Sequence, residues 1–544
     1  ELGEKVLGDG GLKITTTLDL RIQSKLEEAM NDEFSSSDPY VYGFTDGAAT
    51  VEDVKSGQIL ALLGSRDFNY PGFGQDNAAT SFIQPGSNIK PFVYTKLFEK
   101  KPSGQLNFGS GSILKDETID SLYGAQLEND DHAFLGDITI RQSLATSRNI
   151  PAVKAMYISG VADTISTIQK MGAKSYCTNG NDTTVGLAAA IGGCGVKQID
   201  LVNAYATLAR QGVYKPQSTV LEVKNNNTKK VLKKWVDPVG KQVIDKQSAY
   251  VTSDILADAS ARGSFTNASE HGFTIPGIKT GTKTGTSDTG GHAKDLWMSS
   301  FSPVIAMTGW LGNPDTTVLK MGNSHLIGKM IEKVMLYAHN EIYAPQGLWT
   351  TNEWFSQPTG VQRVGNEVYP SWWDKTTSQT KMNMDFDKLS KYKATTYTPA
   401  LAKATLEVTK TIDPITKKEV YIAPDGYDAS KDDNKHLSTD AKPTISVIVD
   451  DNSPVVSATN KNEYTVTITP VVPAGTTYPI SSIDISVDDA VVATLTSAAP
   501  YIYTYTVSPT DISAKTVSIA ATVTDAGLYF ASTDASTGAS VTFP

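Results

Sequence analysis

The sequence predicts an α+β domain followed by a C-terminal all-β domain, an immunoglobulin-like sandwich. A mostly helical stretch over about residues 80–215 has strand-like segments on both sides, at 47–69 and 297–312, which implies a sheet built from distant parts of the chain. From residue 443 onward, short β-branched segments alternate with Pro, Gly, Asp and Ser, as in a β-sandwich.

The composition supports folded domains and excludes several classes of protein. Of 544 residues, 40% are hydrophobic and 19% charged, enough to form sizeable cores in three or four domains. The net charge of −10 leaves no basic excess for phosphates, so we expect no nucleic acid partner. No run approaches the roughly 20 apolar residues of a membrane helix. Without an initiator Met or a signal peptide, the sequence is expected to be a mature chain or a piece of a longer one.

Local patterns place the elements in order. A β-branched segment predicts a strand at 11–17, and apolar residues near helical spacing predict a helix at 19–34. Further strands are expected beside turn or breaker residues, at 48–51, 59–63, 297–301 and 304–310. We expect four parts: an N-terminal linker module (1–45), the α+β domain (46–345), a loop-rich connector containing Trp (346–442) and a β-sandwich module (443–544).

In the last module, strands are expected at 444–449, 464–469, 483–487, 491–495, 501–507, 517–524 and 539–543. Tyr501, Tyr503 and Tyr505 alternate, so they line one face of a strand. We favour packing within the sandwich over a platform for stacking glycans.

The segment Gln84-Pro85-Gly86-Ser87-Asn88-Ile89-Lys90 combines a turn with a pair of reactive side chains. A helix that starts at Ser87 places Lys90 on the same helical face. A Lys amine kept neutral by burial or by another cation can take the proton of a Ser hydroxyl and activate it as a nucleophile. Most pairs at this spacing are solvated, but the Pro-Gly turn and the apolar continuation distinguish this one from those beginning at Ser112, Ser378 and Ser390.

The segment Ser147-Arg148-Asn149 offers a second hydroxyl and an amide. The hydroxyl can relay a proton, and the amide can hold a peptide carbonyl. The alternative is a helix cap, since Ser and Asn are preferred there and Pro151 suits the first turn of a following helix. On this segment alone we favour the cap.

A Lys-Thr-Gly-Thr tetrad occurs twice in succession, at 279–282 and 283–286. A Lys charge and Thr hydroxyls can bind a substrate carboxylate, and the Gly allows a ligand to approach the backbone. The alternative is a flexible polar turn. A phosphate-binding loop is excluded because only three residues separate Gly277 from Gly281, and Thr282 stands before Lys283.

In chain order, Ser-x-x-Lys, Ser-x-Asn and Lys-Thr-Gly form the signature of penicillin-binding proteins and class A β-lactamases. The sequence resembles the transpeptidase domain of penicillin-binding proteins, more closely that of the bifunctional class A kind. Residues 10–19 resemble the segment that joins the glycosyltransferase and transpeptidase domains in that family, and 191–209 and 309–312 also resemble the family. The resemblance covers about residues 10–345 and excludes the C-terminal module.

This resemblance implies a penicilloyl-serine transpeptidase/β-lactamase-like fold, in which a sheet flanked by helices and a helical subdomain enclose the site. It also implies catalytic roles: Ser87 as the acylated nucleophile, Lys90 as its base, Ser147 as the proton relay and Asn149 as a peptide ligand. Asn88 and Ile89 are expected to face away from the chemistry.

Of the two tetrads we choose the second, because Ser287 follows it and the strand at Trp297 is nearer. The resemblance then assigns the terminal carboxylate of a substrate to Lys283, Thr284, Gly285 and Thr286. It assigns the oxyanion hole to the backbone N–H groups of Ser87 and Thr286.

The implied reaction is D,D-transpeptidation, in which Ser87 attacks a D-Ala-D-Ala bond of a peptidoglycan stem peptide and the acyl group passes to a neighbouring amine. β-Lactam antibiotics are the expected inhibitors, and no cofactor or metal is expected. The implied location is the extracytoplasmic face of the bacterial cell membrane, with a membrane anchor and a glycosyltransferase domain upstream.

In such a compartment Cys177 and Cys194 are expected to form a disulfide, the alternative being two buried thiols.

Two other functions carry the same signature. A D,D-carboxypeptidase or a β-lactamase would hydrolyse the acyl-enzyme, although the sequence has no Glu-x-x-Leu-Asn for β-lactamase deacylation. A non-catalytic β-lactam sensor or wall scaffold would simply retain the acyl group. The acidic run 128–131 resembles a calcium loop only in its charge. Structural or surface roles are expected for His132, His271, His292, His325, His339 and His436.

Overall fold

The computed structural model describes residues 11–265, 271–374, 380–416, 418–424, 426–450, 455–456, 463–496, 498–508, 516–534 and 536–543. The chain divides into two compact units. The first unit comprises Glu1–Ser378 and Ile412–Lys418, and the second comprises Gln379–Thr411 and Glu419–Pro544. The expected connector, 346–442, is therefore shared between the two units.

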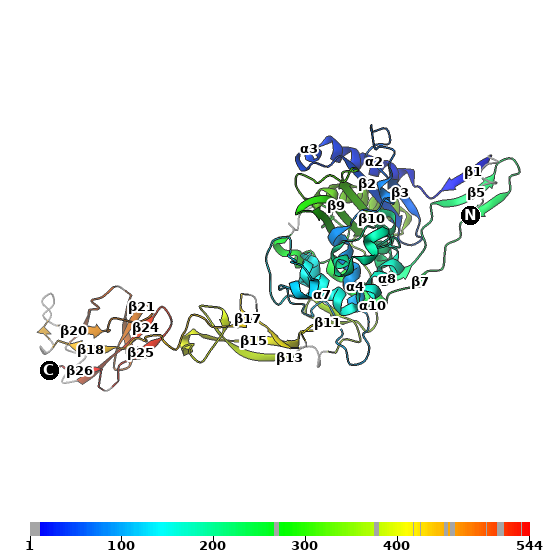
Figure 1. The fold of residues 1–544 in the computed structure, drawn as a ribbon. Helices are drawn as coiled ribbons and strands as arrows, with labels where there is room; N and C mark the ends of the chain where they lie inside the picture. The colour runs from blue at the N-terminus through cyan, green and yellow to red at the C-terminus, as the bar shows by residue number, and fades with distance from the viewer. Residues whose placement is uncertain are drawn as a thin grey trace. The chain divides into compact units, whose positions relative to one another are not determined.

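A five-stranded antiparallel sheet forms the centre of the first unit, in the order β3-β2-β10-β9-β8 (Figure 1). Strands β2 and β3 come from the start of the chain, whereas β8, β9 and β10 come from more than 200 residues later, which confirms the prediction of a sheet assembled from distant segments. The strand bounds are β2 Asp46–Asp53, β3 Ile59–Leu63, β8 Gly281–Thr289, β9 His292–Phe301 and β10 Ile305–Gly312.

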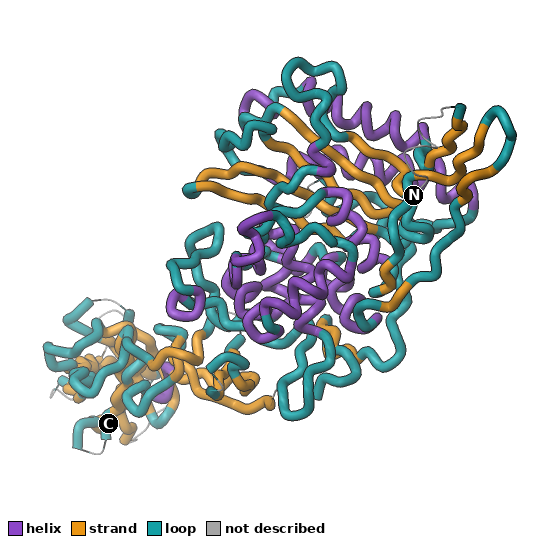
Figure 2. The backbone as a smooth tube through the Cα atoms, turned by 45° about the vertical axis from the view of Figure 1, so that its right-hand side comes forward, coloured by secondary structure: helices purple, strands orange, loops and turns teal. Residues whose placement is uncertain are grey.

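Helices cover both faces of this sheet (Figure 2). Helices α2 (Leu20–Ser35) and α11 (Ile327–Tyr337) pack on one face, where Met307 and Leu311 of β10 join their core. Trp310 of the same strand points to the opposite face and joins the core of the helical subdomain. The period-two alternation of β10 thus connects the two cores through one central strand.

The helical subdomain follows the prediction over residues 80–215, except that residues 99–139 form a largely irregular excursion. The disulfide between Cys177 and Cys194 lies in this subdomain, which confirms the expected pairing. The helix bounds are α4 Lys90–Phe98, α5 Asp120–Tyr123, α6 Ile140–Ala145, α7 Asn149–Ser159, α8 Val161–Met171, α9 Gln198–Ala209 and α10 Lys246–Leu256.

Smaller elements complete the first unit. The predicted N-terminal strand is β1, which pairs with β5 at the edge of a separate three-stranded sheet, β1-β5-β6. Two-stranded pairings join β4 to β7 and β11 to β12. The bounds are β1 Leu12–Thr16, α3 Asp38–Tyr42, β4 Val213–Tyr214, β5 Val220–Asn225, β6 Val231–Lys234, β7 Lys241–Gln242, β11 Gln362–Val364 and β12 Glu367–Tyr369. None of the helices in the described residues is long and apolar enough to cross a membrane.

The second unit contains only strands and one short 3-10 helix among its described residues. Its first part is a five-stranded sheet, β16-β15-β13-β14-β17, in a region for which composition predicts loops. This sheet escapes prediction because polar residues dominate it and its buried core is small, with Phe386 and Val408 at the centre. The bounds are β13 Thr380–Asp387, β14 Tyr392–Lys393, β15 Lys403–Ile412, β16 Glu419–Ile422 and β17 Asp428–Asp432.

The remaining strands form two further sheets around a shared core that includes Ile468, Ile485 and Val523. Each of the seven expected strands is present, and Tyr501, Tyr503 and Tyr505 pack against this core. The fold class is confirmed, with an α+β domain followed by an all-β C-terminal region. The bounds are β18 Ser446–Val449, β19 Val455–Val456, β20 Tyr464–Val471, β21 Ile480–Val487, β22 Ala490–Leu495, β23 Tyr503–Val507, β24 Thr516–Asp525, β25 Phe530–Ser532 and β26 Ala539–Thr542.

Candidate active site

The turn that carries Ser87 packs directly on the edge strand β8. Ser87 lies in a 3-10 turn, η2 (Gly86–Ile89), which continues into α4. A Cβ on Gly86 would come within 2.1 Å of the carbonyl oxygen of Thr286, and a Cβ on Gly285 within 2.2 Å of that of Pro85. The backbones of the Ser87 turn and of β8 are therefore in direct contact, and only glycine fits at these two positions. The sequence-predicted residues Ser87, Gly285 and Thr286 come together in this way.

Further contacts fix the same turn. Trp297 of β9 donates its indole N–H to the carbonyl oxygen of Gln84 at 2.9 Å. Asn88 is fully buried and accepts a hydrogen bond from the Tyr205 hydroxyl, while Ile89 joins the hydrophobic core. These two side chains therefore face the core and leave Ser87 and Lys90 to form the site.

Lys90 is fully buried, yet it forms no ion pair with a carboxylate of the described residues. Its Nζ donates to the carbonyl oxygen of Ser147 at 2.6 Å and to Oδ1 of Asn149 at 2.7 Å. The first two motifs of the sequence are thus joined by hydrogen bonds. Both acceptors are uncharged, so nothing in direct contact with Nζ requires the amine to carry a charge.

Ser147 links Lys90 to the third motif. Its backbone φ is +60°, an uncommon value for a residue with a side chain. Nζ of Lys283, on β8, donates to Oγ of Ser147 at 2.8 Å and to the carbonyl oxygen of Thr284 at 2.8 Å. Ser147 therefore contacts both lysines, Lys90 through its backbone carbonyl and Lys283 through its hydroxyl.

Both lysines are driven toward the neutral form. Burial lowers the pKa of Lys90 well below its usual value, and the nearby charges of Lys283 and Arg148 lower it further. Burial, together with the charge of Arg262, lowers the pKa of Lys283 to about 7. An amine that is neutral near pH 7 is able to accept a proton, as base catalysis requires.

The irregular segment 99–139 supports Asn149 from behind. Asn149 donates its backbone N–H to Oδ1 of Asn129 at 2.8 Å, and its Nδ2 donates to the carbonyl oxygen of Glu128 at 2.8 Å. Arg148 forms ion pairs with buried Asp116 and with Asp131. The acidic run 128–131 thus has a positioning role, which the sequence does not signal because its partners lie downstream and upstream in the chain.

The two copies of the tetrad occupy different environments. Lys283 is buried at the site, whereas Lys279 is exposed and its Nζ lies 5.2 Å from the centre of the Trp354 ring. Thr284 is buried beside Lys283. Thr286 is exposed, and its hydroxyl is hydrogen-bonded to that of Ser324 at 2.7 Å rather than to the lysines.

Two residues near β8 escape the sequence interpretation. Ser324 donates its hydroxyl to the carbonyl oxygen of Gly285 at 2.6 Å and so ties β8 to the start of α11. Arg262 is buried, donates to the carbonyl oxygen of Leu256 and stacks on Phe273. Neither residue belongs to a recognisable motif, because each comes close to β8 only when the chain folds.

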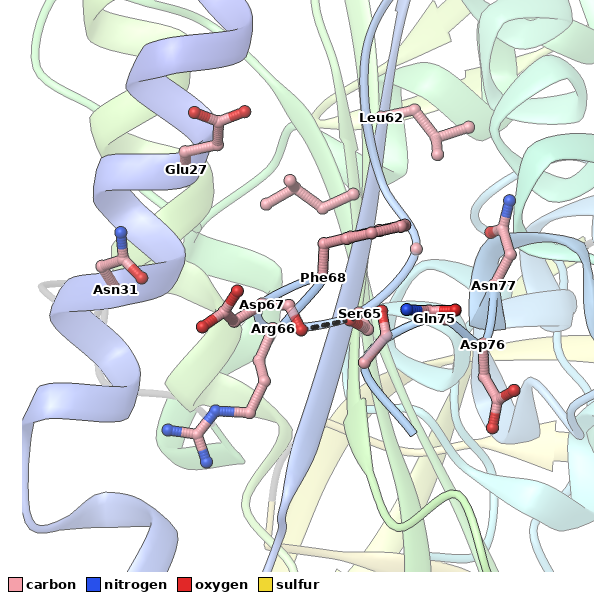
Figure 3. A pocket seen from close by; sticks show the side chains of 13 residues that line it. Glu27, Asn31, Leu62, Ser65, Arg66, Asp67, Phe68, Gln75, Asp76 and Asn77 are labelled. Carbon is pink, nitrogen blue, oxygen red and sulfur yellow. Dashed lines mark hydrogen bonds between the residues drawn. The ribbon is translucent and has the colours of Figure 1, made fainter. Parts of the chain in front are cut away.

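Other candidate features lie apart from these lysines. His339 is buried and donates or accepts at Ser302, and burial lowers its pKa to about 4, as suits a structural residue. A cavity of about 600 Å³ lies between α2 and the segment after β3. Its lining side chains are shown in Figure 3. Glu27, Arg66 and Asn77 are among its lining residues, but none of the motif residues is.

Comparison with known proteins relates this fold and site to a family. The penicillin-binding protein transpeptidase domain family matches residues 47–331. Penicillin-binding protein 1A/1B of Bacillus subtilis (strain 168) is 29% identical over 318 residues, which are 56% of this chain and 32% of the relative. Penicillin-binding protein 1F of the same organism is 30% identical over 331 residues, which are 59% of this chain and 43% of the relative. The chain thus spans less than half the length of these relatives.

A solved structure shares the fold. It is that of the PonA1 protein from Mycobacterium tuberculosis in complex with penicillin V, at a TM-score of 0.52 and 23% identity, covering 66% of this chain and 91% of that one. The matched family region, 47–331, contains the sheet, the helical subdomain and all three motifs in their expected order. The chain belongs to the penicillin-binding protein transpeptidase domain family.

Proposed function

We propose that this chain is a serine D,D-transpeptidase that cross-links peptidoglycan stem peptides through an acyl-enzyme on Ser87. The observation that carries the proposal is the hydrogen bonding of Lys90. A neutral amine has two N–H groups and one lone pair, and the carbonyl of Ser147 and the amide of Asn149 occupy both N–H groups. The lone pair is then left for the hydroxyl of Ser87, one turn earlier on the same helix.

In the acylation step, Ser87 Oγ forms a bond to the carbonyl carbon of the penultimate D-Ala, and its proton passes to Nζ of Lys90. The negative charge that develops on the carbonyl oxygen is stabilised by the backbone N–H groups of Ser87 and Thr286. Close backbone packing at Gly86 and Gly285 supports this pairing of donors. The C–N bond then breaks, and the proton taken up by Lys90 is returned through the Ser147 hydroxyl to the leaving amine of D-Ala.

Lys283 supplies the charge for the terminal carboxylate. As an ammonium group it has three N–H groups, of which two are engaged by Ser147 and by the Thr284 carbonyl. The third is available to the substrate. A carboxylate bound there raises the pKa of Lys283 again, because an opposite charge favours the protonated form. Asn149 contributes its second Nδ2–H to the peptide.

β-Lactams imitate the D-Ala-D-Ala bond in this mechanism and acylate the same serine. Labelling with a fluorescent penicillin, followed by mass spectrometry of the labelled peptide, tests the assignment. Ser87→Ala should abolish labelling, whereas the matched control Ser112→Ala, which alters another serine of the Ser-x-x-Lys type, should leave it unchanged. Modification of any other serine in the Ser87→Ala variant would contradict the proposal.

A second experiment separates transfer from hydrolysis. A thioester or peptide donor is supplied with a D-amino acid as acceptor, and the products are quantified. Transpeptidation predicts that the acyl group is recovered mainly as the transfer product when the acceptor is in excess. Exclusive release of free acid would identify a carboxypeptidase or β-lactamase, and a persistent acyl-enzyme without turnover would identify a sensor.

A further inference from the structure

Three buried side chains meet at one end of the five-stranded sheet of the second unit. Asp387 is the last residue of β13, Asp433 follows directly after β17, and His436 lies in the next turn. Their exposed fractions are 0%, 6% and 1%. One oxygen of each Asp and Nδ1 of His436 all lie within 4.8 Å of one another.

Negative charge is in excess at this place. Asp525, also fully buried, ends β24 and begins the turn whose Gly527 carbonyl lies 2.8 Å from Nε2 of His436. No lysine or arginine of the described residues forms an ion pair with Asp387, Asp433 or Asp525, so the imidazole is the one basic group in contact. Buried carboxylates require compensating positive charge.

Two buried carboxylate oxygens at this place, Oδ1 of Asp387 and Oδ2 of Asp525, have no hydrogen-bond partner among the described residues. Oδ2 of Asp387 accepts the backbone N–H groups of Leu389 and Ser390, whereas Oδ1 is fully buried and accepts none. Oδ1 lies 3.6 Å from Nδ1 of His436, so it points into the cluster. A buried anionic oxygen without a hydrogen bond requires an explanation, and a bound cation provides one.

The orientation of His436 identifies the kind of ligand. Nδ1 lies 2.7 Å from Oδ2 of Asp433, and Nε2 faces the Gly527 carbonyl. A neutral imidazole has a single N–H, and the carbonyl requires it on Nε2. The lone pair of Nδ1 is then directed at the two carboxylates. In metal sites, a ligating histidine usually binds the ion through one ring nitrogen while the N–H of the other donates to a backbone carbonyl or a carboxylate. His436 has this orientation.

We propose that the second unit binds one divalent transition-metal ion of the zinc type through Oδ1 of Asp387, Oδ2 of Asp433 and Nδ1 of His436. An imidazole nitrogen with carboxylates suits such an ion, whereas calcium prefers oxygen ligands alone. Bonds of about 2.0–2.2 Å to a tetrahedral zinc ion separate its ligands by roughly 3.3–3.6 Å. The distance between Asp387 and His436 has this value, and that between Asp433 and His436 needs to widen by roughly 0.6 Å.

The ion would link β13, β17 and, through His436, the β24–β25 turn of the second unit. Asp387 and Asp433 hold the ends of β13 and β17, and His436 carries the hydrogen bond to the β24–β25 turn. An ion that binds only the folded state stabilises that state, by about 100-fold in the unfolding equilibrium when its free concentration is 100 times its Kd. This inference is independent of the proposed function of the first unit.

Equilibrium dialysis of the whole chain against Zn²⁺, after removal of metals by a chelator, tests the site. We expect about one tightly bound ion per chain, lost in Asp387→Asn and in His436→Gln. The matched controls are Asp432→Asn, an exposed carboxylate beside Asp433, and His292→Gln, an exposed imidazole elsewhere; both should retain the ion. Circular dichroism establishes that each variant is folded.

A second measurement uses the unaltered chain and does not depend on a variant folding. All seven Trp residues lie in the first unit, so Trp fluorescence follows the melting of that unit alone. Calorimetry with and without Zn²⁺ should show a higher melting temperature only for the transition without a Trp signal. An unchanged transition, the absence of a bound ion, or binding retained in both ligand variants would overturn the proposal and leave a protonated His436 as the counter-charge.

Discussion

Two sets of buried cations in the first unit differ in their partners. Arg141, Arg148 and Lys154 each form ion pairs with carboxylates, at Asp254, Asp116 and Glu117 among others. Lys90 and Lys283 are buried to the same degree, but they donate only to hydroxyl and carbonyl oxygens. Arg141, Arg148 and Lys154 lie in the helical subdomain, in or beside α6 and α7. Lys90 lies in the same subdomain at the start of α4, and Lys283 lies on β8.

The difference shows how the same burial serves two purposes. A buried cation beside a carboxylate stays charged and holds segments together, and removing its partner is costly. A buried lysine without a carboxylate loses its proton more easily, which suits the proposed role of Lys90 as a base and lets the charge of Lys283 depend on the substrate carboxylate. Among these lysines, a neighbouring carboxylate, rather than burial alone, therefore distinguishes Lys154 from the proposed catalytic residues Lys90 and Lys283.

The sharpest test exchanges a lysine of each kind for methionine. Lys90→Met should lower the rate of acylation by penicillin by about 10²–10⁴-fold, the usual contribution of a general base. Its free energy of unfolding should change by no more than about 1 kcal/mol, because water can hydrate the half-buried acceptors at Ser147 and Asn149. Stopped-flow labelling and denaturant titration followed by Trp fluorescence measure the two quantities.

Lys154→Met is the matched control, since Lys154 is equally buried but donates to Lys115 and pairs with Glu117. This variant should lose about 1.5–3 kcal/mol of stability, because hydrogen bonds of a charged group contribute more than those of a neutral amine, while its acylation rate stays within about twofold. If the two variants show the same pattern, the comparison between paired and unpaired lysines fails.

The second test compares the lysines of the duplicated tetrad. Lys283→Ala should slow acylation on the order of 100-fold, since removing one member of a buried charge pair costs about 2–5 kcal/mol. Lys279→Ala should have little effect, because that side chain is exposed and its Nζ lies over the Trp354 ring, away from Ser147. A larger effect at Lys279 would show that the substrate carboxylate is bound at the first copy.

The sequence predicts the parts of the site that lie in short motifs. Ser87 and Lys90 are one helical turn apart, and Lys283 and Gly285 alternate on one strand, so local geometry already fixes their relation. The tertiary contacts of β8 are not predictable in this way. Arg262 and Ser324 approach it from elsewhere in the chain, and a lone Arg or Ser carries no pattern.

The fold shows the same limit. Hydrophobic strands such as β10 were predictable because both of their faces are buried. The sheet from β13 to β17 was not, because strands such as β13 expose mostly polar residues and only Phe386 and its neighbours form a core. The same region contains Asp387, whose relation to His436 depends on strand pairing that the sequence pattern does not reveal.

The third test removes a carboxylate from the structural set. Asp116→Asn should lower the free energy of unfolding of the first unit by about 3 kcal/mol, because Arg148 then loses the partner with which it is buried. Asp131→Asn is the matched control on the same guanidinium. Asp131 is 54% exposed, so its loss should cost less than about 1 kcal/mol. Equal losses in the two variants would contradict the distinction, and Trp fluorescence during urea unfolding provides the measurement.

The smallest expected effect is in the pH dependence of acylation. The pKa of Lys283 is lowered to about 7 by burial and by Arg262, so above pH 7 the free protein loses the charge that binds the carboxylate. The second-order rate constant, which reports the ionisation of the free enzyme, should therefore fall about tenfold per pH unit on the alkaline side. Lys283→Arg keeps its charge throughout this range, so its alkaline fall should disappear even if its rate is lower overall. A rate that instead rises from pH 7 to 9 in the unaltered protein but not in Lys283→Arg would identify Lys283 as a base and return the carboxylate to another residue.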